Sequence, residues 1–323
     1  MQLSIIICTR NRAESLRCTL ESIGKSSVPE GWTVEVLVVD NGSTDQTEQM
    51  VRRTNYSQMS AKYIREPRVG KGYAYNAGIS AAIGEVLLFT DDDVRVPTRW
   101  IEEMCRPILN GTADAVAGGV VYPAEYAAAL SKPVISSRRS WFGSTEELDP
   151  RQPVSMVGAN MAFHRRVLQK VPQFDVELGP GALGFADESL FSFQLLAAGY
   201  KLIGAFDVSA EHHFDLTRLT REGLLDLARK MGRSHAFIFH HWQHQRSRLV
   251  VPRLGLCHLV RYWTRCFNHG DNVPGGISER ALQLEYDLAF YREYIVQRRR
   301  QHKYPLRNPV MQFDYKQPGL AGN

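Results

Sequence analysis

Residues 85–94 read EVLLFTDDDV, an apolar run that ends in three consecutive aspartates. An uninterrupted apolar run of this kind is typical of a strand in a sheet that is covered on both faces. Two earlier runs, LSIIICT at 3–9 and VEVLVVD at 34–40, have the same character, and segments with helical spacing separate the three. This order predicts an α/β fold built on a mostly parallel sheet with right-handed crossovers.

Polar residues stand where these expected strands end. Thr9 closes the first run, Asp40 closes the second, and the aspartates 91–93 follow the third. Ligands of such sheets bind outside the carboxyl ends of the strands. We therefore expect these residues to line one crevice.

The three aspartates are crowded like charges, which raise one another's pKa unless a cation relieves the repulsion. Mg²⁺ or Mn²⁺ suits such oxygen ligands, held by one or two carboxylates while a substrate diphosphate completes the coordination shell. The residues themselves leave a second interpretation open, a solvated acidic turn ahead of the next helix.

The composition is that of a globular chain with a mildly basic balance. With 44% hydrophobic and 23% charged residues among 323, the chain can bury a core, which excludes disorder throughout. Its length predicts one large domain, or one domain with an appendage. The net charge of +5 is too small to indicate nucleic acid and favours anionic ligands or an acidic lipid surface.

The cysteines and the start of the chain indicate a cellular location. The five cysteines contain no C-x-x-C pair, which argues against a disulfide framework or a thiolate zinc site and suits a reducing cytoplasm. The apolar start is followed at once by Arg10 and Arg12, so we expect a strand rather than a signal peptide. No run approaches the roughly 18 apolar residues of a spanning helix. The stretch LVVPRLGLCHLVRYW at 249–263 leaves contact with a membrane surface open.

Beyond residue 94 the pattern loosens. Short strands are expected within 114–122, 155–165 and 201–208, and a helix over 189–200. Ser278 is expected to cap a long helix over 279–300, and the basic run 298–300 to complement its dipole. An extended tail follows from Tyr304.

Two patterns are interpreted as structural. Residues 179–184, GPGALG, spell G-x-G-x-x-G, but Pro180 and the lack of a preceding apolar strand argue against a dinucleotide site and favour a loop over the acceptor. His240, His241 and His244 have no Cys or acidic residue nearby, which favours a packed or solvated helix face over a zinc site.

Six segments occur together in a characteristic order. They are SIIICTRNR (4–12), VLVVDNGSTDQT (36–47), VGKGYAYNAGISAAIG (69–84), FTDDDV (89–94), GANMAF (158–163) and the pair Asp187-Glu188 ahead of a helix ending in AAGY. In this ordered set the chain resembles the inverting nucleotide-sugar glycosyltransferases of family 2, which have the GT-A fold. The resemblance implies a GT-A domain over 1–232, with a nucleotide-sugar half at 1–125 and an acceptor half at 126–232. A helical extension and extended tail would occupy 233–323.

The resemblance also implies which residues bind the substrates. Asp40 would accept a hydrogen bond from a uracil or guanine N–H, although an Asx turn within DNGSTD is the local alternative. Lys71 and Asn76 match positions near the diphosphate and ribose. The implied substrate-binding residues are Thr9, Arg10, Arg12, Asp40, Lys71, Asn76, Asp91 and Asp92, with Gly158 and Asn160 on the acceptor side.

The metal site and the base are likewise implied by the resemblance. Asp91 and Asp93 match the outer carboxylates of the D-x-D motif, and His212 matches a late metal-site histidine, with His213 as its alternative. Mn²⁺ or Mg²⁺ is the expected cofactor. Glu188 matches the general base and Asp187 the position before it, an order of residue types that is reversed in this chain. A helix N-terminus with an acidic first turn is the structural alternative.

Together these features predict a metal-dependent inverting glycosyltransferase of the hexosyltransferase type. It would move a sugar from a UDP-linked donor to a hydroxyl of a glycan, a lipid-linked glycan or a small molecule. A non-catalytic nucleotide-sugar-binding or scaffold protein on the same fold is the alternative. No nucleic acid partner is expected, whereas a homodimer and peripheral membrane contact are left open.

Overall fold

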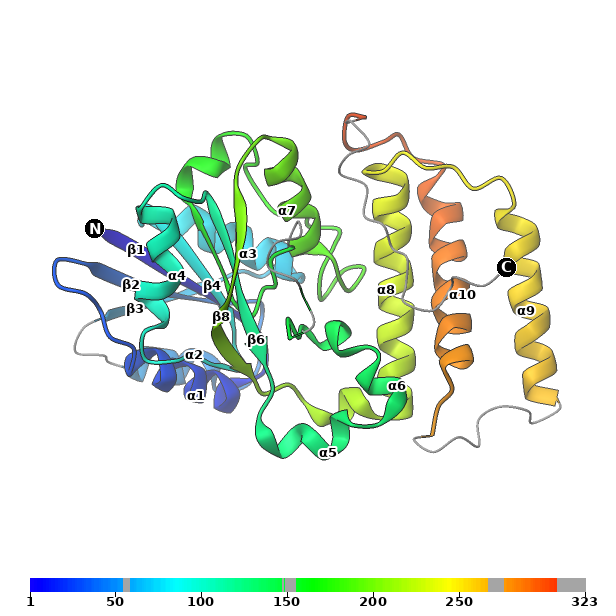
Figure 1. Cartoon of the computed structure of the whole chain (residues 1–323), viewed down its shortest axis with the longest axis horizontal. Helices are drawn as coiled ribbons and strands as arrows, with labels where there is room; N and C mark the ends of the chain where they lie inside the picture. Colours follow the sequence, from blue (N-terminus) through cyan, green and yellow to red (C-terminus); the bar gives the residue numbers. More distant parts are fainter. Residues whose placement is uncertain (55–58, 147, 149–154, 267–275, 307–323) are drawn as a thin grey trace.

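The structure is a computed structural model that describes residues 1–54, 59–146, 148, 155–266 and 276–306. Its described strands form an eight-stranded sheet in the order β3-β2-β1-β4-β7-β6-β8-β5. Helices cover both faces of this sheet, and three further helices stand in a row at one side (Figure 1). The predicted α/β class is confirmed.

The first half of the sheet is parallel, as the sequence predicts. β1 (Gln2–Thr9) lies between β2 (Thr33–Asp40) and β4 (Val86–Asp91), and β3 (Met59–Arg65) lies beside β2. The register pairs Thr9 with Asp40 and Cys8 with Asp91. The three strand ends therefore lie side by side, where the crevice was expected.

The second half of the sheet is mixed. β7 (Met161–His164) runs antiparallel to β4 and to β6 (Ala115–Val121), whereas β8 (Leu202–His212) runs parallel to β6. Only the last part of the expected strand 155–165 pairs, because the Asn160 N–H turns back to donate to the Val157 carbonyl at 2.9 Å.

β8 is longer than expected. It continues past residue 208 to His212, which pairs with Val94 of the two-residue strand β5 (Val94–Arg95). The extension brings His212 next to the end of the aspartate run.

Alternate residues of each strand supply two separate cores. Ile5 and Ile7 pack on the side of α1 (Ala13–Gly24) and α4 (Trp100–Leu109), whereas Ile6 packs on the side of α3 (Lys71–Ala81) and α7 (Asp187–Ala197). Successive strand side chains point to opposite faces, so a strand that is apolar throughout needs cover on both. α2 (Thr47–Arg53) packs beside β3 and α1.

The C-terminal part is a row of three helices. α10 (Glu279–Gln297) lies between α8 (Arg221–His241) and α9 (Val250–Cys266) (Figure 1). Ser278 caps α10 as predicted, since its Oγ accepts from the Ala281 N–H at 3.1 Å. Residue 232 lies inside α8, so the predicted boundary falls within a helix, and the division into two domains stays a prediction.

The basic run 298–300 differs from its prediction. α10 ends at Gln297, so the three arginines follow the helix instead of forming its last turn. Arg300 reaches Glu177 through both guanidinium nitrogens, at 2.6 and 2.9 Å. It therefore joins the C-terminal part to the loop ahead of α7.

Short elements connect the rest. They are α5 (Ala127–Leu130), α6 (Pro133–Ser136) and the 3₁₀ turns η1 (Ala124–Tyr126), η2 (Arg139–Phe142), η3 (Arg165–Gln169) and η4 (Leu216–Leu219). Four cysteines are described as free thiols, Cys8, Cys18, Cys105 and Cys257. None of the helices in the described part of the chain combines the length and the apolar character that a membrane span needs.

Candidate active site

Two of the three aspartates join the end of β1. The Thr9 hydroxyl donates to Asp92 Oδ2 at 2.7 Å. The Arg12 guanidinium, at the N-terminus of α1, contacts Asp92 Oδ1 at 3.1 Å and Asp93 Oδ2 at 2.6 Å. Four predicted site residues are thus brought into one cluster by the parallel pairing of β1 and β4.

The two carboxyl groups of this cluster titrate differently. Burial and the charge of Asp93 raise the pKa of Asp92 to about 7. Burial also acts to raise the pKa of Asp93, but His212 and Arg12 outweigh it and hold that pKa below its usual range. Asp93 is therefore the ionised member of the pair at neutral pH, as a metal ligand would need to be.

The first aspartate points elsewhere, toward Lys71. The Lys71 ammonium, in the first turn of α3, lies 2.8 Å from Asp91 Oδ1 and 3.1 Å from Glu188 Oε1. The Tyr75 hydroxyl, one helical turn further along α3, lies 3.5 Å from the same Glu188 oxygen. Lys71 thus joins the end of β4 to the start of α7, two segments that are distant in sequence.

Asp187 and Glu188 have opposite electrostatic environments. Burial acts to raise the pKa of Glu188, but the positive charge of Lys71 and the hydrogen bonds to the carboxylate together outweigh it and lower that pKa. Burial raises the pKa of Asp187 well above its usual range, and the charge of Glu188 raises it further. Glu188 is therefore the more readily ionised of the two, and Asp187 keeps its proton to a higher pH.

Two glycines make this packing possible. A Cβ on Gly158 would fall 2.2 Å from Glu188 Oε1, and one on Gly179 would fall 2.7 Å from the Asp187 carboxyl carbon. Gly179 also has a φ of +78°, in the left-handed region that favours glycine. The loop 179–184 therefore packs against Asp187, and its Pro180 carbonyl accepts from the Lys71 N–H at 2.8 Å.

The two late histidines face different partners. His212 lies with Nε2 at 3.3 Å from Asp93 Oδ1, and its Nδ1 is 3.0 Å from the Phe142 carbonyl oxygen. His213 instead contacts Glu211 at 2.5 Å through its Nε2. A carbonyl can only accept, so His212 Nδ1 must carry a proton. Nε2 then either donates a second proton to Asp93 or, in a neutral ring, presents its lone pair there.

This pair fits a divalent cation, although the full predicted ligand set does not assemble. A carboxylate and an imidazole lone pair that face each other need a proton or a cation between them, and both are ligands of Mn²⁺. Asp91 is paired with Lys71 instead. Within the described ranges, no group of three or more His, Cys, Asp or Glu side chains is arranged to hold a metal ion.

Asp40 and Asn76 hold the backbone of their own surroundings. Asp40 is buried, and its carboxylate accepts from the Ser43 N–H at 2.7 Å and from the Tyr63 hydroxyl at 2.6 Å. The Asn76 amide bonds both the N–H and the carbonyl of Phe174, at 2.8 and 2.9 Å. Asp40 thus lies at the expected strand end, and its bond to the Ser43 N–H is the kind of contact that an Asx turn makes.

Asn160 and Arg10 lie outside these clusters. Asn160 is fully buried, accepts from the Trp100 indole at 2.8 Å and donates to the carbonyls of Gly119 and Val208, each at 2.8 Å. These hydrogen bonds engage both the oxygen and the nitrogen of the Asn160 side chain with the protein interior. Arg10 is exposed, just past the end of β1.

The C-terminal histidines are bonded to the protein. His240, His241 and His244 contact the Arg300 carbonyl at 3.1 Å, the Gln297 side chain at 2.9 Å and the Tyr304 carbonyl at 2.9 Å. They therefore dock the end of the described chain on α8, in agreement with the packed-face interpretation.

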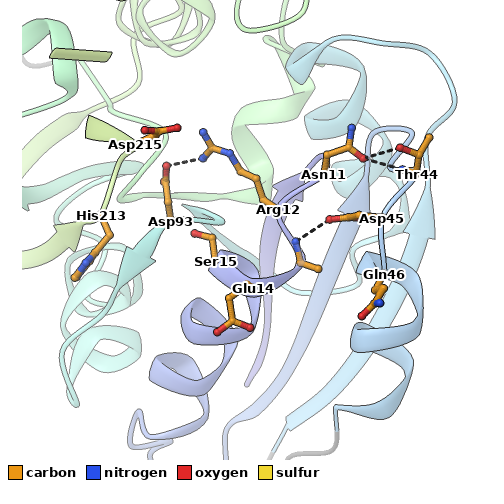
Figure 2. Close-up of a pocket in the computed structure, with 11 residues that line it drawn as sticks. Asn11, Arg12, Glu14, Ser15, Thr44, Asp45, Gln46, Asp93, His213 and Asp215 are labelled. Atoms are coloured by element: carbon orange, nitrogen blue, oxygen red, sulfur yellow. Dashed lines mark hydrogen bonds and ion pairs between the residues drawn. The ribbon is translucent and has the colours of Figure 1, made fainter. Parts of the chain in front are cut away.

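A cavity of about 890 Å³ opens beside Arg12 and Asp93. Figure 2 shows Arg12 extending toward Asp93, with Asp215 nearby and with Asn11 bonded to Thr44 on the other side. Sequence reasoning missed the lining residues Asn11, Asp45 and Asp215. Asn11 lies two residues after the end of β1 and Asp45 five residues after the end of β2, and this nearness to strand ends is a signal that could have identified them.

The solved structures identify the class of fold. The mannosyltransferase PcManGT from Pyrobaculum calidifontis, in complex with GDP-Man and Mn²⁺, is 19% identical with a TM-score of 0.60, covering 91% of this chain and 86% of that one. S. aureus TarS 1-349, in complex with UDP-GlcNAc, is 17% identical with a TM-score of 0.53, covering 93% and 92%. The chain therefore has the GT-A fold.

The sequence comparisons identify the family. Residues 4–171, slightly more than half of the chain, match the family described as Glycosyl transferase family 2. The chain belongs to glycosyl transferase family 2, as its ordered motifs predicted.

Curated relatives agree with this family. Glycosyltransferase AglE of Haloferax volcanii is 28% identical over 211 residues, which are 65% of this chain and 66% of AglE. The uncharacterized glycosyltransferase alr2836 of Nostoc sp. is 34% identical over 99 residues, 30% of each chain. The chain thus spans less than two thirds of the length of these relatives.

Proposed function

We propose that this chain is a metal-dependent inverting glycosyltransferase that transfers a sugar from a UDP-linked donor to a hydroxyl acceptor. The observation that carries the proposal is the meeting of Asp91 and Glu188 at Lys71, from segments 97 residues apart in the sequence. Asp93, which lies beside His212, is two residues after Asp91 in the sequence. Family membership supports nucleotide-sugar chemistry at this site.

Glu188 would act as the general base. Because Lys71 and its hydrogen bonds lower its pKa, its carboxylate can accept the proton of an acceptor hydroxyl while the new glycosidic bond forms. Asp187, whose pKa is raised by burial and by the charge of Glu188, is less readily ionised for this role. A single displacement at the anomeric carbon would invert its configuration.

Lys71 and Arg12 would bind the donor's phosphates. Both cations lie at the carboxyl ends of the strands and are paired with carboxylates in the structure. Asp93 and His212 would hold a divalent cation, which when bound supplies positive charge to the leaving diphosphate. The donor diphosphate would complete its coordination shell.

The UDP assignment is supported by TarS, whereas Asp40 suits either nucleotide. A carboxylate at the end of β2 suits bases that present an N–H, which uracil and guanine both do. The TarS structure contains UDP-GlcNAc, whereas the PcManGT structure contains GDP-Man. The two nucleotides are therefore separate arms of the test.

A mass-spectrometric screen of UDP- and GDP-linked sugars tests the proposal. With Mn²⁺ and a panel of hydroxyl acceptors, we expect release of UDP that is lost with a chelator and in Asp93→Asn. The matched control Asp207→Asn changes an exposed aspartate on β8 and should keep wild-type turnover. Full turnover under chelation would contradict metal dependence, release of GDP alone would contradict the donor, and binding without turnover would favour the scaffold alternative.

A further inference from the structure

α9 has one face on the protein and one face outward. Val250 is fully buried, and Leu254, Cys257 and Arg261 follow at helical spacing as partly buried residues on the same side. Arg261 also contacts Glu285 of α10 at 3.3 Å. α9 is the outermost helix of the row, with α10 as its neighbour (Figure 1).

The outward face of α9 is apolar. Leu256, Leu259 and Trp263 are 60%, 53% and 54% exposed, and their i, i+3, i+7 spacing places them in one stripe. A helix whose outer face meets water normally carries polar residues there. Of the thirteen large hydrophobic residues that are exposed in the described chain, six lie within 249–263, so the apolar surface is concentrated in one patch.

The surroundings of this patch are basic. Residues 243–263 contain four arginines and no Asp or Glu. Arg246, Arg248 and Arg253 are exposed at the start of the helix, beside the apolar stripe. The surface therefore combines apolar side chains with one sign of charge.

We propose that α9 docks the protein on a lipid surface that contains anionic headgroups. Leu and Trp side chains would enter the boundary between headgroups and acyl chains, while the arginines stay at the level of the phosphates. Tyr262, 65% exposed on the flank, suits the same interface because its ring is apolar and its hydroxyl polar.

Charge complementarity favours lipid over a second copy of the chain. In a two-fold dimer through α9 the same surface would meet itself, which brings two sets of arginines together with no acidic residue from α9 between them. Anionic headgroups instead offset that charge, by about 1 kcal/mol for each basic residue near the surface.

The test is cosedimentation of the full chain with vesicles. Phosphatidylcholine vesicles with about 30% phosphatidylglycerol should bind the protein, whereas phosphatidylcholine alone should bind it far more weakly. Combined Leu256→Gln, Leu259→Gln and Trp263→Gln should abolish binding. Combined Arg246→Gln, Arg248→Gln and Arg253→Gln should weaken it by roughly 100-fold.

A matched control and an assembly measurement complete the test. Ile83→Gln removes a side chain that is 60% exposed just before β4, and should bind vesicles like the wild type. All variants should keep the melting temperature and donor hydrolysis of the wild type, because the changed side chains are exposed and outside the site. Failure of the wild type to bind, undiminished binding of the apolar variant, or a dimer that depends on α9 without vesicle binding would each overturn the inference.

Discussion

The strand ends and α9 have opposite arrangements of polarity. At the strand ends, Asp92, Asp93 and Lys71 have little surface in contact with water. Asp93 pairs with Arg12, and Lys71 pairs with Asp91. On α9, Leu256 and Trp263 face outward. Buried charge and exposed apolar surface both cost free energy in the isolated chain. The difference teaches that the two proposals rest on opposite features, buried charge for an anionic, cation-bearing ligand at the sheet and exposed apolar surface for a lipid surface at the helix.

The largest expected effect is a loss of activity at the strand ends. Glu188→Gln removes the ionised carboxylate, and we expect a loss of kcat of roughly 100- to 10,000-fold, the usual contribution of a general base. Asp187→Asn replaces the carboxyl group of raised pKa by a neutral group of similar shape, so we expect a much smaller loss. Steady-state transfer assays measure both.

The same two variants can also show that the general base is Asp187 and not Glu188. A large loss in Asp187→Asn with a small one in Glu188→Gln would make Asp187 the base. Thermal melts of both variants separate a lost proton acceptor from a lost fold, since each side chain also lies in the first turn of α7.

The second prediction compares stability in the two regions. Ile6 is fully buried in β1, so Ile6→Ala should lower the free energy of unfolding by about 2–5 kcal/mol. Leu256→Ala, on the exposed face of α9, should change it by less than about 0.5 kcal/mol. Urea titrations measure both. A Leu256→Ala loss as large as that of Ile6→Ala would mean that the α9 face packs on protein in solution.

The sequence predicts the first half of the fold closely. The runs at 3–9, 34–40 and 85–90 are apolar without interruption because both faces of each strand are covered, and each became β1, β2 or β4. The later strands were less predictable. β7 keeps only Met161–His164 because the preceding residues turn, and β8 extends to His212 because it pairs with β5.

The sequence predicts that several candidate site residues lie near one another, but it does not predict their pairings. Thr9, Arg12 and the aspartates meet because parallel strands bring their carboxyl ends together. Asp91 contacts Lys71, whereas Asp93 contacts His212. This difference depends on the directions of side chains on adjacent residues, which cannot be predicted from the spacing of residues in the sequence. The hydrogen bonds of Asn160 could not be predicted either, because their partners, the Trp100 indole and two backbone carbonyls, come next to it only in the folded chain.

The third prediction concerns His235, a half-buried histidine in the helical row. His235 of α8 lies with Nδ1 at 2.7 Å from the Tyr286 hydroxyl of α10, and burial lowers its pKa to about 4. The unfolded chain then binds the proton first, at a pKa of about 6.5, so stability should fall as the pH falls from about 6.5 to about 4, by on the order of 3 kcal/mol.

Unfolding titrations across that pH range check this prediction. His235→Gln keeps a hydrogen-bonding side chain without a titrating one, so it should reduce the acid sensitivity. His258→Gln is the matched control, because His258 is exposed on α9, and it should behave like the wild type. Equal acid sensitivity in all three proteins would show that His235 does not control this transition.

The smallest expected effect concerns Asp175, which joins the loop ahead of α7 to the C-terminal segment. Its carboxylate, buried ahead of α7, accepts from the Tyr304 hydroxyl and lies 2.8 Å from the Lys303 ammonium. Tyr304→Phe removes one of these two partners, and we expect a loss of about 1.5 kcal/mol in the free energy of unfolding. Tyr262→Phe, which removes an exposed hydroxyl on α9, should cost nothing measurable. Because the chain from Asp175 leads through the loop 179–184 to Asp187, Tyr304→Phe should also raise KM for the acceptor more than it lowers kcat. An unchanged KM together with the expected loss of stability would limit this contact to holding the C-terminal segment in place.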